Sequence, residues 1–126
     1  MTRQEIIGFC LALPGAYEDY PFDDVLDENA CTAMRHRQNK KSFAFIMRHN
    51  EELYLNLKCD PLEADFLRSV YQSVIPGWHM NKTHWNTVII SSDCAGGHVC
   101  DVPEDEIKMM IERSYDIIKP KVRKKR

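Results

Sequence analysis

Apolar residues recur at helical spacing in three segments of the chain and alternate with polar residues in several others. The helical segments cover residues 3–12, 61–71 and 103–118, and an Asp-Pro pair gives the second a strong start signal. Each segment predicts a helix with one buried face. The residues assigned to these faces are Ile6, Ile7, Phe9, Cys10 and Leu13, then Leu62, Phe66, Leu67 and Val70, then Ile107, Ile111, Ser114 and Ile118.

Strand-like stretches cover residues 30–37, 42–48 and 53–57, joined by short polar connections typical of an antiparallel meander. Residues 86–91 predict a fourth strand and residues 98–101 a short fifth one. The resulting order is α-β-β-β-α-β-β-α. This order predicts a two-layer α+β domain, with an antiparallel sheet of about five strands and three helices packed mainly on one face.

Three local features refine this prediction. Residues 16–29 are acidic and aromatic without helical or strand period, so we expect a surface loop there. Alternation within the second strand places Phe43, Phe45 and Met47 on one face. The Pro76-Gly77 pair predicts a turn, because proline presets φ and glycine accepts φ > 0.

The charge of the chain is unevenly distributed. The net charge is −2, but residues 119–126 hold six of the 17 Lys and Arg residues and no acid, which leaves −8 on residues 1–118. A body that acidic does not attract phosphate backbones through its overall field, so nucleic-acid binding would need local basic patches or the tail. We expect residues 1–118 to form one domain and residues 119–126 to be a disordered basic tail.

Several functional classes are disfavoured by the sequence. No apolar run approaches the roughly 18 residues of a membrane span and the N-terminus has no cleavable signal, so a cytoplasmic protein without membrane contact is expected. No GxSxG, Walker or GxGxxG motif occurs, and we expect no catalytic residue and no cofactor. Cys59, just before a helix, could be activated by the helix dipole, but a small residue at a tight junction is the favoured interpretation. A monomer is favoured.

Metal binding is also disfavoured. The five cysteines form no CxxC pair, and free thiols are the simplest interpretation. A zinc site would draw on His79, His84, Cys94, His98 and Cys100, but their spacing matches no standard zinc motif. We therefore expect no metal.

Five stretches of the chain occur in a distinctive order: ALPGAYEDYPF, KSFAFI, LNLKCDPLEADFLR, IPGWHMNKTHWNTV and ERSYDII. Together they resemble the MmcQ/YjbR family of small bacterial proteins. The resemblance implies a CyaY-like α+β fold, also called a double-wing arrangement, and a DNA-binding function, and it supplies no catalytic residues. Residues 91–102 depart from the family's pattern. The residues that match its most distinctive stretches are Asn56, Lys58, Trp78, His79, Asn81, Lys82, His84 and Trp85.

Basic residues on the first hairpin support DNA as the ligand. Arg35, Arg37, Lys40 and Lys41 cluster there, and with the tail they make the only credible phosphate-tracking surface. The tail residues concerned are Lys121, Arg123, Lys124, Lys125 and Arg126. The alternative is a solvated hairpin and a charged, soluble terminus.

A small anionic ligand, a metabolite or a nucleotide, is the second hypothesis. If the Pro76-Gly77 loop folds over the sheet, Lys58, Lys82 and His84 could converge on one anion, with either tryptophan as a stacking surface. The alternative is that His84 and Trp85 are buried and hold the loop down by packing. A third hypothesis is a protein adaptor that uses exposed aromatic residues, namely Tyr17, Tyr20 and Phe22.

Overall fold

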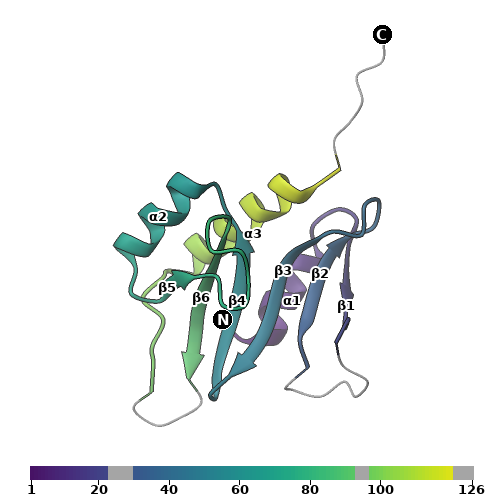
Figure 1. Cartoon of the computed structure of the whole chain (residues 1–126). Coiled ribbons are helices and arrows are strands. Elements are labelled where there is room, and N and C mark those ends of the chain that lie inside the picture. The colour runs from purple at the N-terminus through teal and green to yellow at the C-terminus, as the bar shows by residue number, and fades with distance from the viewer. Residues whose placement is uncertain (23–29, 93–96, 121–126) are drawn as a thin grey trace.

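The computed structural model describes residues 1–22, 30–92 and 97–120, without the side chains of residues 91 and 92. Within these residues the fold is α+β, with three helices and one antiparallel sheet of six strands in the order β1-β2-β3-β4-β6-β5 (Figure 1). In chain order the elements are α1 (Arg3–Leu11), β1 (Ala16–Asp19), β2 (Thr32–His36), β3 (Ser42–His49), β4 (Glu52–Lys58), α2 (Pro61–Val70), β5 (Val74–Pro76), β6 (Trp85–Ser92) and α3 (Glu104–Ile118).

Helices α1 and α3 lie on the same side of the sheet (Figure 1). Helix α3 packs on the central strands β3 and β4, and α1 packs on β1 and β2. The core between these layers includes Ile6, Cys10, Met34, Ile46, Leu55, Leu57, Val88, Ile107 and Ile111. The predicted two-layer α+β architecture is confirmed, and so are the buried positions assigned to the stripe on α3 before its last turn.

Strand β1 occupies part of the segment that the sequence predicted as a surface loop. The chain reverses at Gly15, whose φ of +71° is a conformation that favours glycine. The Gly15 carbonyl oxygen accepts a hydrogen bond of 2.8 Å from the Arg37 amide. This turn aligns the following residues with β2, where Tyr17 lies opposite Arg35. As an edge strand, β1 needs pairing on one side only, so it forms without an apolar alternation.

The edge around β5 also differs from the prediction. Residues 74–76 form a short strand on β6, with Val74 opposite Val88, where the sequence predicted only a turn. Residues 98–101 do not form the predicted fifth strand. Instead, the Asp101 carboxylate accepts hydrogen bonds of 2.8 and 2.9 Å from the amides of Gln72 and Ser73. This side-chain cap and an isolated β-bridge at Val99 hold the segment in place of a strand.

The buried face predicted for α2 is wrong in three of its four residues. Leu62, Phe66 and Val70 are 81%, 63% and 50% exposed, whereas Ala64 and Leu67 are buried. Helix α2 packs mainly against β5 and β6 at the edge of the sheet, and the Glu63–Arg113 ion pair of 2.5 Å joins it to α3. This contact with the sheet edge is small and buries only Ala64 and Leu67 among the apolar residues of the helix. The apolar residues spaced four apart, at positions 62, 66 and 70, face solvent instead.

A β-bulge moves Phe43 to the helix side of the sheet. The pairing register of β2 and β3 shifts near this residue, and the Phe43 ring lies 5.2 Å from the Tyr115 ring on α3. Phe45 instead packs 5.8 Å from Trp85 on the other face. The prediction that Phe43 shares a face with Phe45 and Met47 is therefore wrong, because an extra residue in the strand breaks the alternation.

Candidate nucleic-acid interface

The turn between β2 and β3 presents three cationic side chains to solvent. Arg37, Lys40 and Lys41 are exposed, and neither lysine forms an ion pair with a described residue. The turn is fixed by two short-range hydrogen bonds, from the Lys40 amide to the His36 carbonyl at 2.8 Å and from the Lys41 amide to Asn39 Oδ1 at 3.0 Å. The cations are thus held in place by backbone contacts that leave their charges free.

Asn39 joins this turn to the end of α3. Its Nδ2 donates a hydrogen bond of 2.9 Å to the Ile118 carbonyl, one of the helix-terminal oxygens that lack a partner within the helix. The next residue, Lys119, is exposed and lies 3.6 Å from Asp116, an ion pair that solvent largely screens. We call the surface formed by Arg37, Lys40, Lys41 and Lys119 the basic end.

The tail residues predicted to contact nucleic acid lie outside the described residues. They are Lys121, Arg123, Lys124, Lys125 and Arg126, and in the sequence they directly follow Pro120. Since Pro120 itself adjoins the hairpin turn, the chain enters this basic stretch from the basic end.

Arg35, the fourth predicted hairpin cation, is used within the protein. Its Nε lies 2.9 Å from Asp19 Oδ2, and a terminal nitrogen donates to the Lys40 carbonyl at 2.8 Å. The side chain is 22% exposed, so Arg35 braces β1 against the hairpin turn. Arg37 lies over the ring of Tyr17 at 5.7 Å from its centroid, in a cation–π contact that leaves the guanidinium exposed.

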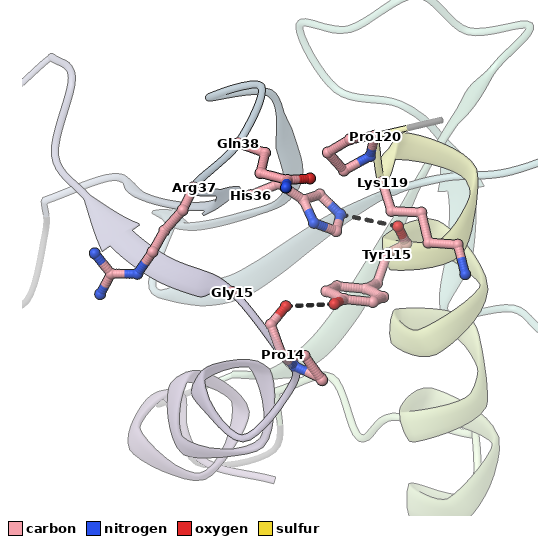
Figure 2. Close-up of a pocket in the computed structure, with 8 residues that line it drawn as sticks. All are labelled: Pro14, Gly15, His36, Arg37, Gln38, Tyr115, Lys119 and Pro120. Atoms are coloured by element: carbon pink, nitrogen blue, oxygen red, sulfur yellow. Dashed lines mark hydrogen bonds between the residues drawn. The ribbon is translucent and has the colours of Figure 1, made fainter. Parts of the chain in front are cut away.

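A cavity of about 490 Å³ opens beside the basic end (Figure 2). Three segments meet around it: the turn after α1, the β2–β3 turn and the last turn of α3. Its lining residues are Pro14, Gly15, His36, Arg37, Gln38, Tyr115, Lys119 and Pro120. The sequence analysis did not find this site, because its walls are far apart in the chain and no local motif links them.

His36 is the buried polar group of this cavity. Its Nε2 lies 2.9 Å from the Tyr115 carbonyl oxygen. A carbonyl only accepts hydrogen bonds, so Nε2 carries a proton and Nδ1 of the neutral ring is an acceptor. The one hydrogen bond of the His36 ring to a described residue is made by Nε2, so Nδ1 has no partner among those residues. The Tyr115 ring lies 4.3 Å from the imidazole, and its hydroxyl donates to the Pro14 carbonyl.

The loop between β5 and β6 is closed by its own hydrogen bonds. The Gly77 amide donates to the Trp85 carbonyl, and Lys82 Nζ donates to the Gly77 carbonyl, both at 2.9 Å. Gly77 is required for close packing and not for a positive φ as predicted: a Cβ there would lie 2.8 Å from the Trp85 Cβ. The positive φ in this loop, +58°, belongs to His79.

Several predicted ligand-binding residues have partners within the protein. Asn56 is fully buried on β4, and its Oδ1 accepts a hydrogen bond from the Thr87 hydroxyl. The Trp78 ring packs between the rings of His49 and His79, with centroids 4.3 and 4.1 Å away. These contacts hold the loop against the sheet face opposite the helices.

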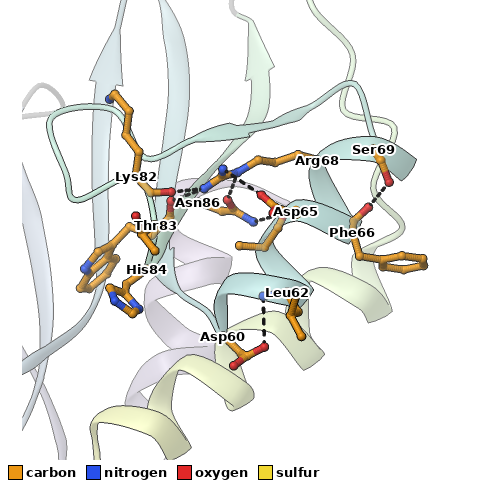
Figure 3. A network of polar contacts seen from close by, with 12 residues as sticks. Asp60, Leu62, Asp65, Phe66, Arg68, Ser69, Lys82, Thr83, His84 and Asn86 are labelled. Carbon is orange, nitrogen blue, oxygen red and sulfur yellow. Dashed lines mark hydrogen bonds and ion pairs between the residues drawn. The ribbon is translucent and has the colours of Figure 1, made fainter.

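The other predicted ligand residues lie around this loop. Lys58 is half-buried at the end of β4, opposite Trp85 on β6. Asn81 Oδ1 accepts a hydrogen bond from the Thr83 amide and so caps the turn that follows Asn81. His84 is exposed and Trp85 is half-buried, so the alternative in which both are buried is wrong for His84. In Figure 3 the Lys82 side chain points away from His84, and the two groups do not converge.

Arg68, which the sequence analysis did not single out, fastens α2 to this loop (Figure 3). Its Nε donates to Asn86 Oδ1 at 2.6 Å, and a terminal nitrogen donates to the carbonyls of Lys82 and Trp85. The Asn86 amide in turn donates to the Ala64 carbonyl at 3.2 Å. No local sequence pattern predicts which distant residues an arginine in the last turn of a helix will contact.

The cysteine and metal hypotheses gain no support from the described residues. Burial raises the pKa of the Cys59 thiol to about 11, with the charges of Glu63 and Asp60 adding to the effect. The thiol is therefore protonated at neutral pH and is not an activated nucleophile. In the described ranges no three His, Cys, Asp or Glu side chains are placed to hold a metal ion. Cys94 lies outside those ranges.

His98 and Asp101 fix the divergent segment to the start of β5. His98 Nε2 lies 2.7 Å from Ser73 Oγ, which also accepts a hydrogen bond from the Asp101 amide. Hydrogen bonds from Ser73 hold the pKa of the Asp101 carboxyl below its usual range. Ser73 is fully buried, so this cluster serves the fold. Cys100 is half-buried beside it and packs against the core.

Comparison with known proteins places the chain in a family. The family model described as YjbR matches residues 11–117. The chain belongs to the YjbR family. It is 31% identical over 129 residues to the uncharacterised protein YyaQ of Bacillus subtilis, covering 94% of this chain and 99% of YyaQ. It is 27% identical over 115 residues to the uncharacterised protein YjbR of Escherichia coli, covering 91% of this chain and 85% of that one.

Solved structures show the same fold as this YjbR-family chain. A crystal structure of a Pseudomonas syringae protein superposes with a TM-score of 0.75 at 26% identity and covers 94% of this chain and 100% of its own. A Deinococcus radiodurans protein of family DUF419 gives 0.73 at 29%, covering 93% and 78%. The YjbR match includes the hairpin turn but ends before Lys119, so the basic tail lies beyond it. Within the described residues, no helix is both long and apolar enough to cross a membrane.

Proposed function

We propose that this protein is a non-enzymatic binding protein that holds DNA phosphates at the basic end. The observation that carries this proposal is the Asn39–Ile118 hydrogen bond, which brings the hairpin turn and the end of α3 together. The hairpin cations and Lys119, which are far apart in the sequence, thereby share one end of the described structure. Lysine and arginine side chains without internal partners are the groups that neutralise phosphates and release counterions.

The charge distribution supports phosphate contacts at this end and not elsewhere. Residues 1–118 carry −8, although that count includes the hairpin cations. Away from the basic end these residues therefore carry a net negative charge, which on average disfavours the approach of a polyanion. Binding of this kind reads the phosphate backbone and is independent of base sequence.

The alternative, a small anion under the Pro76-Gly77 loop, has weaker support. One of its two predicted lysines, Lys82, donates to the Gly77 carbonyl of its own loop. Asn56 donates and accepts within the sheet, to Met47 Sδ at 3.8 Å and from Thr87. An anion would have to displace these contacts, whereas the lysines of the hairpin are already available.

The test is fluorescence anisotropy with a labelled random-sequence duplex across a salt series. Full-length protein should bind at about 50 mM salt and lose affinity steeply as salt rises. Replacing both Lys40 and Lys41 with glutamine should lower the slope of log K against log salt by about 2, since each phosphate contact contributes about 0.9. The matched control replaces Lys82 and Lys108, which lie away from the basic end, and should leave the slope unchanged.

A version ending at Ile118 separates the contribution of the tail. Retained but weaker binding would support a surface shared by the hairpin and the tail. If duplex DNA does not bind at about 50 mM salt, or if the control pair weakens binding as much as the hairpin pair, the proposal fails.

A further inference from the structure

The cavity beside the basic end has an uncharged interior. Its inner walls are the rings of Pro14, His36, Tyr115 and Pro120 and the side-chain amide of Gln38. None of its lining residues is acidic. The volume, about 490 Å³, lies in the range of about 300–1,000 Å³ that is typical of small-molecule sites. The site is built to accept a neutral group of moderate size.

The positive charges lie at the rim of the same cavity. Figure 2 shows the guanidinium of Arg37 and the ammonium of Lys119 on opposite sides of the cavity, both directed away from the Tyr115 ring. Lys40 follows in the same turn as Gln38 and is exposed. A ligand that fits this arrangement has a neutral ring system and negative charge outside it.

Two polar groups inside the cavity have no partner among the described residues. His36 is only 3% exposed, and in the neutral ring its Nδ1 is a hydrogen-bond acceptor that no described residue uses. The Gln38 amide offers both a donor and an acceptor. The neighbouring Tyr115 hydroxyl is satisfied by the Pro14 carbonyl, so Tyr115 contributes its ring. An acceptor, an amide and aromatic and proline surfaces are the groups that bind the edge and face of an unpaired nucleobase.

We propose that this cavity binds one unpaired nucleobase, with the adjoining phosphates held by the cations at the rim. The inference rests on the proposed function, because the cations of the basic end hold the phosphates of the strand whose base enters the cavity. It adds a preference: a base paired inside a duplex cannot enter, so single-stranded DNA or an unpaired end binds better than a duplex of the same sequence. The same chemistry could be supplied by a free nucleotide, and the experiment separates these two sources.

The first measurement compares a single strand with its duplex, and follows His36 by nitrogen-15 NMR during addition of a deoxynucleoside monophosphate. Stacking and hydrogen bonding of one base are worth about 1–3 kcal/mol, which corresponds to roughly five- to 150-fold in affinity. We expect the single strand to bind at least about fivefold more tightly. We also expect a change in the His36 Nδ1 resonance, because this atom accepts a hydrogen bond from the base.

Gln38→Leu tests the cavity without changing charge. Gln38 is exposed, so this variant should fold normally. It should lose most of the preference for single strands while keeping the salt slope for duplex DNA. Gln72→Leu is the matched control, since Gln72 is also exposed and does not line this cavity. The control should behave as the unaltered protein.

The outcomes distinguish the inference from the function on which it rests. If duplex and single strand bind equally and the His36 resonance does not move, the nucleobase site is refuted and the phosphate-binding proposal remains. If neither DNA binds but the monophosphate shifts His36, the site takes a free nucleotide and the DNA proposal fails. If nothing binds and nothing shifts, both are overturned. A Gln38→Leu protein that retains its single-strand preference would also overturn the nucleobase site.

Discussion

Ser114 joins α3 to two strands of the sheet through one hydroxyl group. Its Oγ donates to the Phe43 carbonyl at 2.5 Å and accepts a hydrogen bond from the Lys58 amide at 2.9 Å. Ser114 itself is fully buried. Alanine would fill nearly the same space, so Ser114→Ala removes the two hydrogen bonds with little change in packing.

The cost of this substitution follows from the groups that it leaves unpaired. A buried donor or acceptor without a partner costs about 1–3 kcal/mol, and two such groups remain, a carbonyl and an amide. Alanine has a higher helix propensity than serine and offsets about 0.5 kcal/mol. Two such costs less this offset give a net loss of about 1.5–5.5 kcal/mol. With a slope of about 1–3 kcal/mol per M, the urea midpoint should fall by at least about 0.5 M.

Urea unfolding followed by tryptophan fluorescence measures this loss, and Ser69→Ala is the matched control. Ser69 is exposed, and its hydroxyl donates to the Phe66 carbonyl of its own helix at 2.7 Å. Water can replace that bond, so the control should stay within about 0.5 kcal/mol of the unaltered protein. If Ser114→Ala costs less than about 1 kcal/mol, or no more than the control, the hydrogen bonds of the hydroxyl to the Phe43 carbonyl and the Lys58 amide do not stabilise the fold, and the reasoning is refuted.

Two pairs of variants test the packing, and one single variant tests the pH dependence of stability. Gly77→Ala should lower the free energy of unfolding by about 1–3 kcal/mol, because the new Cβ would collide with Trp85. Gly8→Ala should raise it by about 0.5–1 kcal/mol, because the new Cβ faces open space in α1. Thermal melts in which both variants shift in the same direction would contradict this. Phe66→Ala should change the free energy of unfolding by under about 0.5 kcal/mol, because Phe66 is exposed. Leu67→Ala should lower it by about 2–5 kcal/mol, because Leu67 is buried. Equal losses for the two variants would mean that the apolar stripe on α2 is buried. Burial raises the pKa of the Cys10 thiol from 9.0 to about 12. The protonated thiol therefore contributes fully to the free energy of unfolding below pH 9, and this contribution is lost as the pH rises toward 12. Cys10→Ala should therefore flatten the alkaline decline in stability by about 1.4 kcal/mol per pH unit, and an unchanged slope would argue against it.

The sequence predicted the elements whose signals are local. The N-cap and first-turn proline of α2 and the apolar stripe of α3 depend on residues close together in the chain, and both helices begin within one residue of the predicted start. The sheet edges were less predictable. Strand β1 forms because Gly15 returns the chain to β2, and that pairing is a tertiary contact without an apolar period.

The same limit explains the errors on α2 and β3. A stripe at positions 62, 66 and 70 has the spacing of a buried face, but burial depends on what lies opposite, and α2 sits at the sheet edge. Phe43 changes face because of a bulge that alternation cannot reveal. In the candidate site, the hairpin lysines could be predicted from charge alone. The partnership of Asn39 with Ile118, and the cavity around His36, depend on segments that meet only in the fold.

In the proposed binding mode, the acidic body gives the basic end a directional role. Beyond about 8 Å at physiological ionic strength, exposed charges are largely screened, so the acids on distant surfaces act weakly on a strand already bound at the hairpin. During approach from solution the same acids disfavour every other orientation. A chain with net charge −2 can thus present one attractive surface to a polyanion. That surface includes Arg37 and Lys119 of the cavity lining, so a strand held there as proposed would have its bases next to His36 Nδ1 and the Gln38 amide, which have no partner among the described residues.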